Sequence, residues 1–156
     1  MLLRHFQKPA YSDGVIDLYP VWHSLAGEEP EFGDVYDYVI TERGRTREIG
    51  RVEARLGESE CLYYFGHVGY HIDPPWRGHH YAARACRLIA GVFRRAGFTS
   101  VVITCDPDNT ASRRTCESLG CERERTVAVP ARVRNRWEIS AEKHRYIWDL
   151  RGGAPE

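Results

Sequence analysis

The sequence predicts an α/β fold in which helices flank a mixed sheet, and three observations support this class. Residues 77–96 carry an apolar stripe at helical spacing. Residues 100–105 form a β-branched run, typical of a strand that is covered on both faces. The chain of 156 residues contains no internal repeat and no low-complexity linker, so we expect a single domain over residues 1–156.

The N-terminal part is expected to contain a strand followed by a helix. Residues 2–6 are a candidate for a short strand. Apolar residues between 12 and 25 recur at helical spacing, and Ser12 or Asp13 would be the N-cap. Pro20 is expected to bend or break this helix.

Three strands are predicted next, over residues 35–42, 48–56 and 61–72, and the last is long and rich in aromatic residues. Short turns separate them, so we expect an antiparallel meander. The helix over 77–96 and the strand over 100–105 should then return the chain as a right-handed parallel crossover beside residues 61–72.

The remaining elements follow from turn residues. Gly97 is placed where a left-handed C-cap belongs, at the end of the long helix. Residues 106–109 form a turn that also supplies an N-cap, and the short helix after it is stopped by Gly120. Two strands, near residues 121–129 and 143–150, complete the prediction.

Composition excludes several classes of protein. Lys and Arg number 22, as do Asp and Glu, so the basic footprint of a nucleic-acid-binding protein is absent. No apolar run approaches the ~20 residues that cross a membrane. The start of the chain lacks the apolar stretch of a signal peptide, so we expect a cytoplasmic protein. Its five cysteines show no C-x-x-C pair and are expected to be reduced.

Residues 66–82 are the most informative stretch, because a strand turns there into a helix. The first turn of a helix exposes backbone N–H groups that have no intrahelical partner, at the positive end of the helix dipole. Gly78 has no side chain to obstruct them, and Arg77 adds a fixed positive charge. The stretch is therefore predicted to bind a diphosphate.

This stretch resembles the acyl-CoA motif of the GNAT superfamily of N-acyltransferases. The motif reads Arg or Gln, two residues of any kind, Gly, one residue of any kind, then Gly or Ala. Arg77 matches its first position and Ala82 its last. His80 stands at the fourth position in place of glycine, which is a departure from the family pattern.

The resemblance continues beyond the motif, through residues 103–112 with Asn109 and through the Glu-Ser-Leu-Gly run at 117–120. It covers roughly residues 48–126. It implies the GNAT fold, whose mixed and strongly twisted sheet is flanked by helices.

The resemblance also implies an acyl donor, acetyl-CoA. Backbone groups of residues 70–72 would pair with its pantetheine, and Arg113 or Arg114 would reach its phosphates. The cofactor-binding residues that follow from the resemblance are Tyr70, His71, Ile72, Arg77, Gly78, His79, His80, Tyr81, Ala82, Asn109, Ser112 and Arg113.

An acceptor amine would attack the thioester directly, with a base to remove its proton and an acid to protonate the departing thiolate. Many family members have a tyrosine as the acid seven residues after the asparagine, where this chain has Cys116. Cys116 is thus one candidate acid, and Tyr70, Tyr81 and Tyr146 are others.

The candidate bases lie on the predicted strands before the helix. They are His67, Glu53 and, less favoured, His71. His67 and His71 are four residues apart on a predicted strand, hence roughly 13 Å apart, which is too far to share one metal ion. We therefore predict no metal site.

The function predicted is acetyl transfer from acetyl-CoA to a primary amine on a small molecule or peptide, in a ternary complex. No nucleic acid or membrane partner is expected, and a homodimer is the further partner that the resemblance implies. Two alternatives stay open. One is a non-catalytic acyl-CoA-binding module, consistent with the missing tyrosine, and the other is a small interaction domain without a cofactor.

Overall fold

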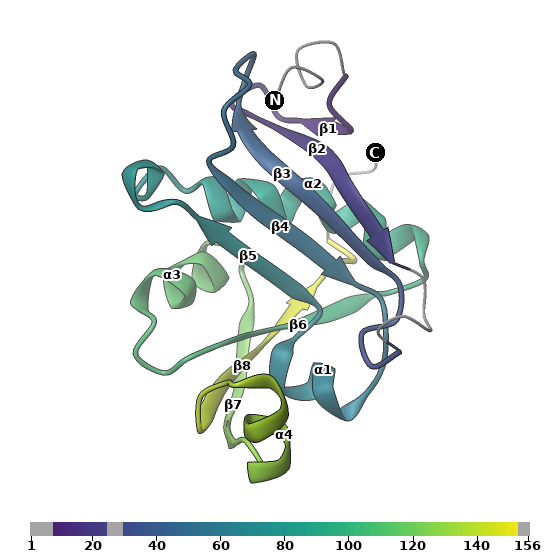
Figure 1. Ribbon diagram of the computed structural model, residues 1–156, viewed down its shortest axis with the longest axis vertical. Coiled ribbons are helices and arrows are strands. Elements are labelled where there is room, and N and C mark those ends of the chain that lie inside the picture. The colour runs from purple at the N-terminus through teal and green to yellow at the C-terminus, as the bar shows by residue number, and fades with distance from the viewer. Residues whose placement is uncertain (1–7, 25–29, 153–156) are drawn as a thin grey trace.

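The computed structural model describes residues 8–24 and 30–152, which form two antiparallel sheets with helices packed around them (Figure 1). The first sheet has its strands in chain order: β1 (Tyr11–Ser12), β2 (Ile16–Ser24), β3 (Val35–Glu42), β4 (Gly50–Arg55) and β5 (Val68–Ile72). In the second sheet β8 (Glu142–Asp149) lies between β6 (Ser100–Cys105) and β7 (Glu122–Ala128). The predicted α/β class is confirmed.

Helices fill the connections between these strands. They are α1 (Glu60–Phe65), a 3₁₀ turn (Pro74–Trp76), α2 (Tyr81–Arg95), α3 (Thr110–Ser118) and α4 (Ala131–Trp137). In Figure 1, α2 lies behind the five-stranded sheet, while α3 stands beside the far end of β5. None of the helices in the described part of the chain is long and apolar enough to cross a membrane.

The core forms where α2 packs against the first sheet. Ile89 and Phe93 of α2 are fully buried in one cluster with Leu18, Ile40 and Val52 of the sheet. Burial of each such side chain stabilises the fold by about 1.5–3 kcal/mol, so the packing of α2 holds the sheet in place. The apolar stripe predicted for this helix is confirmed.

The helix predicted over residues 12–25 is wrong, because this segment forms β2. Ile16 and Leu18 face α2, while Asp17 and Tyr19 on the opposite face are also buried. Because both faces are buried over residues 16–19, this part of the strand lacks the alternation of buried and exposed residues that would have identified it. Pro20 is accommodated at a shift in the β2–β3 register.

The single strand predicted over residues 61–72 is also wrong, since its first half forms α1. Ser59 caps this helix by accepting a hydrogen bond from the Leu62 N–H at 3.2 Å. Gly66 ends it with a backbone φ of +78°, a conformation that favours glycine. The strand begins only at Val68.

The long helix begins at Tyr81 rather than at residue 77. Gly78 and His80 both have left-handed backbone conformations, with φ of +90° and +60°. Residues in that conformation cannot continue a right-handed helix, so the first turn is delayed. At the other end Gly97 has φ +95°, as predicted for the C-cap.

β5 and β6 meet at one point and then separate. Gly66 and Ile103 form an isolated antiparallel bridge, and the His67 N–H donates to the Val102 carbonyl oxygen at 2.7 Å. The predicted parallel pairing is wrong, because β6 pairs along its whole length with β8, and every ladder among the described strands is antiparallel. β5 and β6 are therefore both edge strands, and they diverge beyond the bridge (Figure 1).

Most of the other predicted elements are present in the structure. The strands near 35–42, 48–56, 100–105, 121–129 and 143–150 and the short helix after Asn109 are confirmed, with ends shifted by a few residues. The helix α4 was not predicted. The strand expected over residues 2–6 lies outside the described residues.

Candidate functional site

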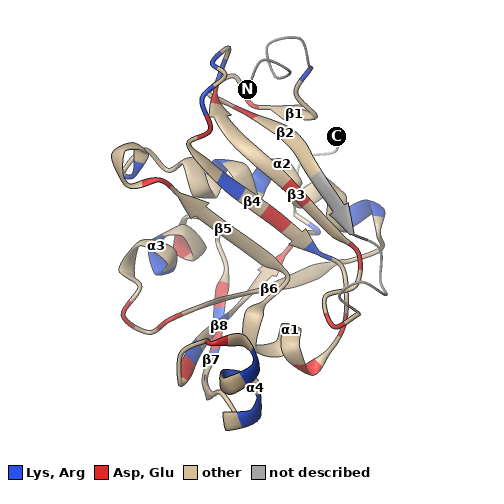
Figure 2. Ribbon diagram, in the orientation of Figure 1, with Lys and Arg blue, Asp and Glu red and all other residues tan. Residues whose placement is uncertain are grey.

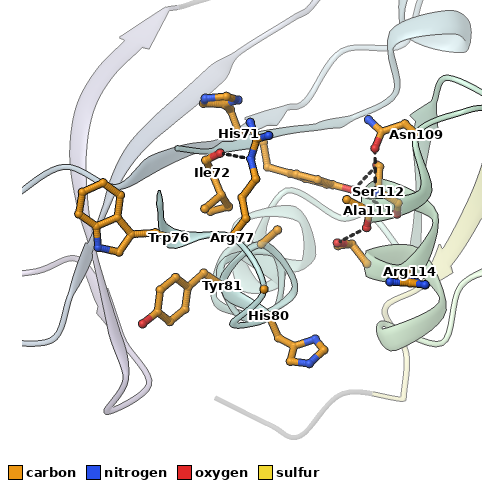
Figure 3. A pocket seen from close by; sticks show the side chains of 14 residues that line it. His71, Ile72, Trp76, Arg77, His80, Tyr81, Asn109, Ala111, Ser112 and Arg114 are labelled. Carbon is orange, nitrogen blue, oxygen red and sulfur yellow. Dashed lines mark hydrogen bonds between the residues drawn. The ribbon is translucent and has the colours of Figure 1, made fainter. Parts of the chain in front are cut away.

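A groove of about 540 Å³ lies where β5 ends and where α2 and α3 begin. Figure 3 shows it from close by, with β5 and the loop after it facing α3. Its lining residues come from three segments: Tyr70, His71, Ile72, Trp76, Arg77, Gly78, His80, Tyr81, Ala82, Asn109, Ala111, Ser112, Arg114 and Thr115.

The first turn of α2 presents unpaired backbone N–H groups to this groove. His80 is the N-cap residue, and its side chain makes no capping hydrogen bond. The amides of Tyr81 and Ala82 are thus left without an intrahelical partner at the positive end of the helix. In Figure 3 the His80 ring points away from Ile72 and Arg77, so histidine at the fourth motif position does not cover the amides.

Two arginines flank the groove from opposite sides. Arg77 donates from Nε to the Ile72 carbonyl oxygen at 2.8 Å, which holds the guanidinium against the end of β5. Arg114 comes from α3, on the far side of the groove (Figure 3). Together with the free amides, these charges make the groove suited to a ligand with several phosphates.

Tyr70 of β5 lines the groove and contacts α3. Its Oη lies 2.5 Å from Ser112 Oγ, and the Asn109 side chain holds the same turn of α3 by accepting from the Ser112 N–H at 3.1 Å. Burial strongly raises the pKa of the Tyr70 phenol, so the phenol keeps its proton.

A second cavity of about 200 Å³ lies between the diverging β5 and β6. It shares Tyr70, Asn109 and Ser112 with the groove, so the two cavities adjoin at these residues. The rest of its lining combines charged, polar and apolar residues: Arg55, Phe65, Val68, Gly69, Thr104, Cys105, Asp106, Ile139 and Lys143.

The structure brings most of the predicted cofactor-binding residues together. Of the twelve, only His79 and Arg113 are missing from the lining of the groove. His79 stacks on the ring of Tyr81 at 5.3 Å between centroids. Arg113 lies instead near Tyr146 and His144 of β8 in the second sheet.

Four lining residues were not in the predicted set. Arg114 was considered beside Arg113, and the rotation of about 100° between neighbouring residues of a helix decides which of the two faces the groove. Ala111 and Thr115 are four residues apart, so the helical period places them on one face. Trp76, next to Arg77, also lines the groove and has the Arg47 guanidinium 4.6 Å from its ring centroid.

His67 lies outside both cavities and is only 7% exposed. Its Nδ1 accepts a hydrogen bond from the Val102 N–H at 3.0 Å, and its Nε2 lies 3.3 Å from Glu58 Oε1. Burial lowers the pKa of this imidazole. With its acceptor nitrogen already occupied, His67 joins β6 to the start of β5 and has no lone pair to offer a substrate.

Cys116 is fully buried and also lies outside both cavities. A hydrogen bond with Cys121, together with burial, raises the pKa of its thiol. A thiol in this position cannot reach a ligand in the groove. Thr115, its neighbour in sequence, is the residue of this turn that lines the groove.

The remaining candidates are distributed around the two cavities. Glu53 faces Gly69 in the β4–β5 register, beside the second cavity, and its Oε1 accepts from Arg55 Nε at 2.6 Å. His71 lines the groove but is exposed, 3.4 Å from Asp73. Tyr81 donates its hydroxyl to Glu42 at 2.9 Å, and Tyr146 lies outside both cavities.

Comparison with known proteins identifies the family. The model of the acetyltransferase (GNAT) domain matches residues 5–122. No match is found among the curated proteins.

Solved structures share the fold at low sequence identity. The ribosomal-protein-S5-alanine acetyltransferase of Vibrio fischeri aligns with 78% of this chain at 19% identity and a TM-score of 0.59. A GNAT-family acetyltransferase from Bacillus anthracis aligns with 73% at 20% identity and 0.55. RimJ of Mycobacterium smegmatis, solved with CoA-disulfide, aligns with 78% at 17% identity and 0.56. The chain spans 64%, 66% and 56% of these proteins, less than two thirds of each.

Proposed function

Because the chain belongs to the GNAT acetyltransferase family, we propose that it transfers an acetyl group from acetyl-CoA to a primary amine. The observation that carries this proposal is the groove with unpaired amides at the start of α2, between Arg77 and Arg114. These groups can bind the diphosphate of an acyl-CoA without any rearrangement of the backbone.

The pantetheine arm of the donor would lie along β5. This strand is the last of its sheet, so the N–H and C=O groups on its outer side have no partner strand within residues 8–24 and 30–152. An arm that contains amide groups can pair with them as an added strand would. An N–H of residues 70–72 would then be directed at the thioester carbonyl oxygen and stabilise the negative charge that forms there.

The reaction would take place where the two cavities adjoin, at Tyr70 and Ser112. The amine, after losing one proton to a base, attacks the thioester carbon, and a C–N bond forms as the C–S bond breaks. The nitrogen then releases a second proton, and the thiolate of CoA takes one up. Tyr70 supplies the hydrogen bond to the thiolate sulfur, because its hydroxyl is the protonated group at the junction of the groove with the second cavity.

We assign the base to Glu53, acting through water. Glu53 pairs with Gly69 of β5, which lines the second cavity, so its carboxylate lies beside that cavity. A direct contact is not required, since one water can carry the proton from the amine to the carboxylate.

A second candidate function is an acyl-CoA-binding module without catalysis. The burial of Cys116, at the position where relatives have a tyrosine acid, favours it. In that case the groove would bind the donor, and no amine would be acetylated.

Two measurements test these proposals. Acetyl-CoA at ~100 times its Kd should stabilise the protein by about 2.7 kcal/mol, which corresponds to a rise in Tm of roughly 5–10 °C for a chain of this length. No shift at millimolar acetyl-CoA would contradict both candidates. Thiol release from acetyl-CoA over a panel of amines then separates the enzyme from the module, since the module would bind the donor and release no thiol.

A further inference from the structure

We propose that the second cavity binds the acceptor amine, and that this acceptor is an amino carboxylate such as a free amino acid. The inference rests on the proposed acetyl transfer and adds the chemical class of the substrate. It is argued from two oppositely charged groups, Arg55 and Asp106, that line the same small cavity.

The position and size of the cavity suit a small acceptor. It meets the acyl-CoA groove at Tyr70 and Ser112, where the thioester would lie. Its volume of about 200 Å³ is below the ~300–1,000 Å³ of sites for drug-sized ligands. Phe65, Val68 and Ile139 provide apolar wall for a side chain.

Arg55 is held rigidly beside this cavity. Its Nε donates to Glu53 at 2.6 Å, and its Nη1 donates to the carbonyl oxygens of Phe65 and Gly66 at 3.3 and 3.2 Å. The guanidinium carbon also lies 5.4 Å from the ring centroid of Phe32. These contacts fix a side chain that is only 15% exposed, so little entropy is lost when it binds a ligand.

The Nη2 of Arg55 remains to bind a ligand. It is the one guanidinium nitrogen of Arg55 that makes no hydrogen bond to another described residue. It lies over Gly69, where an added Cβ would come within 2.5 Å of it. The missing side chain at position 69 thus lets a preorganised cation lie against β5 and face a carboxylate in the cavity.

Asp106 is the opposite charge. Its Oδ1 accepts from Ser140 Oγ at 2.5 Å and from Lys143 Nζ at 2.6 Å. Both of these bonds use one oxygen, so Oδ2 can accept a hydrogen bond from an ammonium group. The Asp106 side chain is 42% exposed, which leaves it accessible to a ligand.

The charges around the cavity balance in pairs. Glu53 neutralises Arg55, and Lys143 neutralises Asp106. A zwitterion therefore adds no net charge, with its carboxylate at Arg55 and its ammonium at Asp106. A polyamine would bring further positive charge toward Arg55 and Lys143, and the N-terminus of a peptide has no α-carboxylate to offer.

The substrate test compares each amino acid that has a primary α-amine with its own α-amide. Thiol release from acetyl-CoA gives kcat/KM for both members of a pair. We expect at least one amino acid to exceed its amide by tenfold or more, because the amide has lost the charge that Arg55 binds. If no amino acid reacts faster than its amide while amines are still acetylated, the inference is overturned and the proposed function stands. If acetyl-CoA binds and no amine is acetylated, both are overturned.

Variants then assign the effect to Arg55. Arg55→Met should lower the ratio of amino-acid to amide kcat/KM by at least tenfold. The control is Arg51→Met, four residues before Arg55 on β4, where Figure 2 shows blue and red segments alternating along the strand. The strand period of two places both arginines on one face. Arg51 pairs with Asp37 and Glu48 and lines neither cavity, so its loss should leave the ratio unchanged.

A second variant and a binding measurement guard against misfolding. Gly69→Ala should displace Nη2 and lower the same ratio even if Arg55→Met does not fold. Calorimetric titration of the preferred amino acid into protein saturated with CoA should give binding that Gly69→Ala weakens. An unchanged ratio together with unchanged binding in both variants would overturn the assignment.

Discussion

Tyr70 Oη lies 2.5 Å from Ser112 Oγ, so one short hydrogen bond joins β5 to α3 at the point where the two cavities adjoin. The bond lies between the edge of the first sheet and the helix that follows β6. With donor and acceptor bound as proposed, a hydroxyl at this place would be in reach of both, whereas Cys116 is buried one turn further along α3.

Tyr70→Phe should lower kcat by about a hundredfold and change KM for acetyl-CoA little, because the hydroxyl acts on the departing thiolate and not on the bound donor. Steady-state kinetics with a reactive amine measures both constants. Tyr11→Phe is the control, since its hydroxyl contacts Arg95 and lies outside both cavities. An unchanged kcat in Tyr70→Phe would remove the phenol from the mechanism.

Arg77→Glu should weaken acetyl-CoA binding at least tenfold. The change puts a negative charge beside the diphosphate and removes the hydrogen bond that holds residue 77 to the Ile72 carbonyl. Calorimetry measures the Kd. Arg125→Glu changes the net charge equally but lies on β7, away from the groove, and should bind as the unchanged protein does. Equal affinity of the two variants would mean that the phosphates bind elsewhere.

The sequence predicted elements whose signals are local. The helix stripe before Gly97, the β-branched run that became β6 and the Asn109 cap each depend on residues close together in the chain, and each is present. β2 was misread because tertiary packing buries both faces of its first half, residues 16–19, which no local pattern encodes.

The groove was predictable and the second cavity was not. The groove is built mainly from the turn after β5 and the start of α3, two continuous segments with recognisable turn residues. The second cavity combines Arg55, Asp106 and Lys143, which are brought together only by the divergence of β5 from β6. His67 is the opposite case, a candidate base by residue type that the structure excludes. Its Nδ1 already accepts a hydrogen bond from the Val102 N–H.

His80→Gly should raise the free energy of unfolding by roughly 0.5–1 kcal/mol. A left-handed backbone costs a non-glycine residue about 1–2 kcal/mol, and glycine avoids this cost. Part of the gain is offset because glycine loses more backbone entropy on folding. Urea denaturation measures the change. The Kd for acetyl-CoA should stay the same, because the amides of α2 are unaltered. His80→Val is the matched variant and should be destabilised, as a β-branched residue fits this conformation poorly. Equal stability of the two would refute the strain at position 80.

His67 should make the protein less stable in mild acid. Burial lowers the pKa of His67 below the 6.5 of a free imidazole, so the unfolded chain takes up a proton first as the pH falls below about 6.5. This contribution destabilises the folded state progressively until the pH reaches the folded pKa, and it is absent above about pH 7.5. His67→Gln should show a shallower loss of stability between pH 7 and 5, measured by urea denaturation at each pH, although it starts lower because the Val102 N–H loses its acceptor. Identical slopes for His67→Gln and the unchanged protein would show that another group governs the acid response.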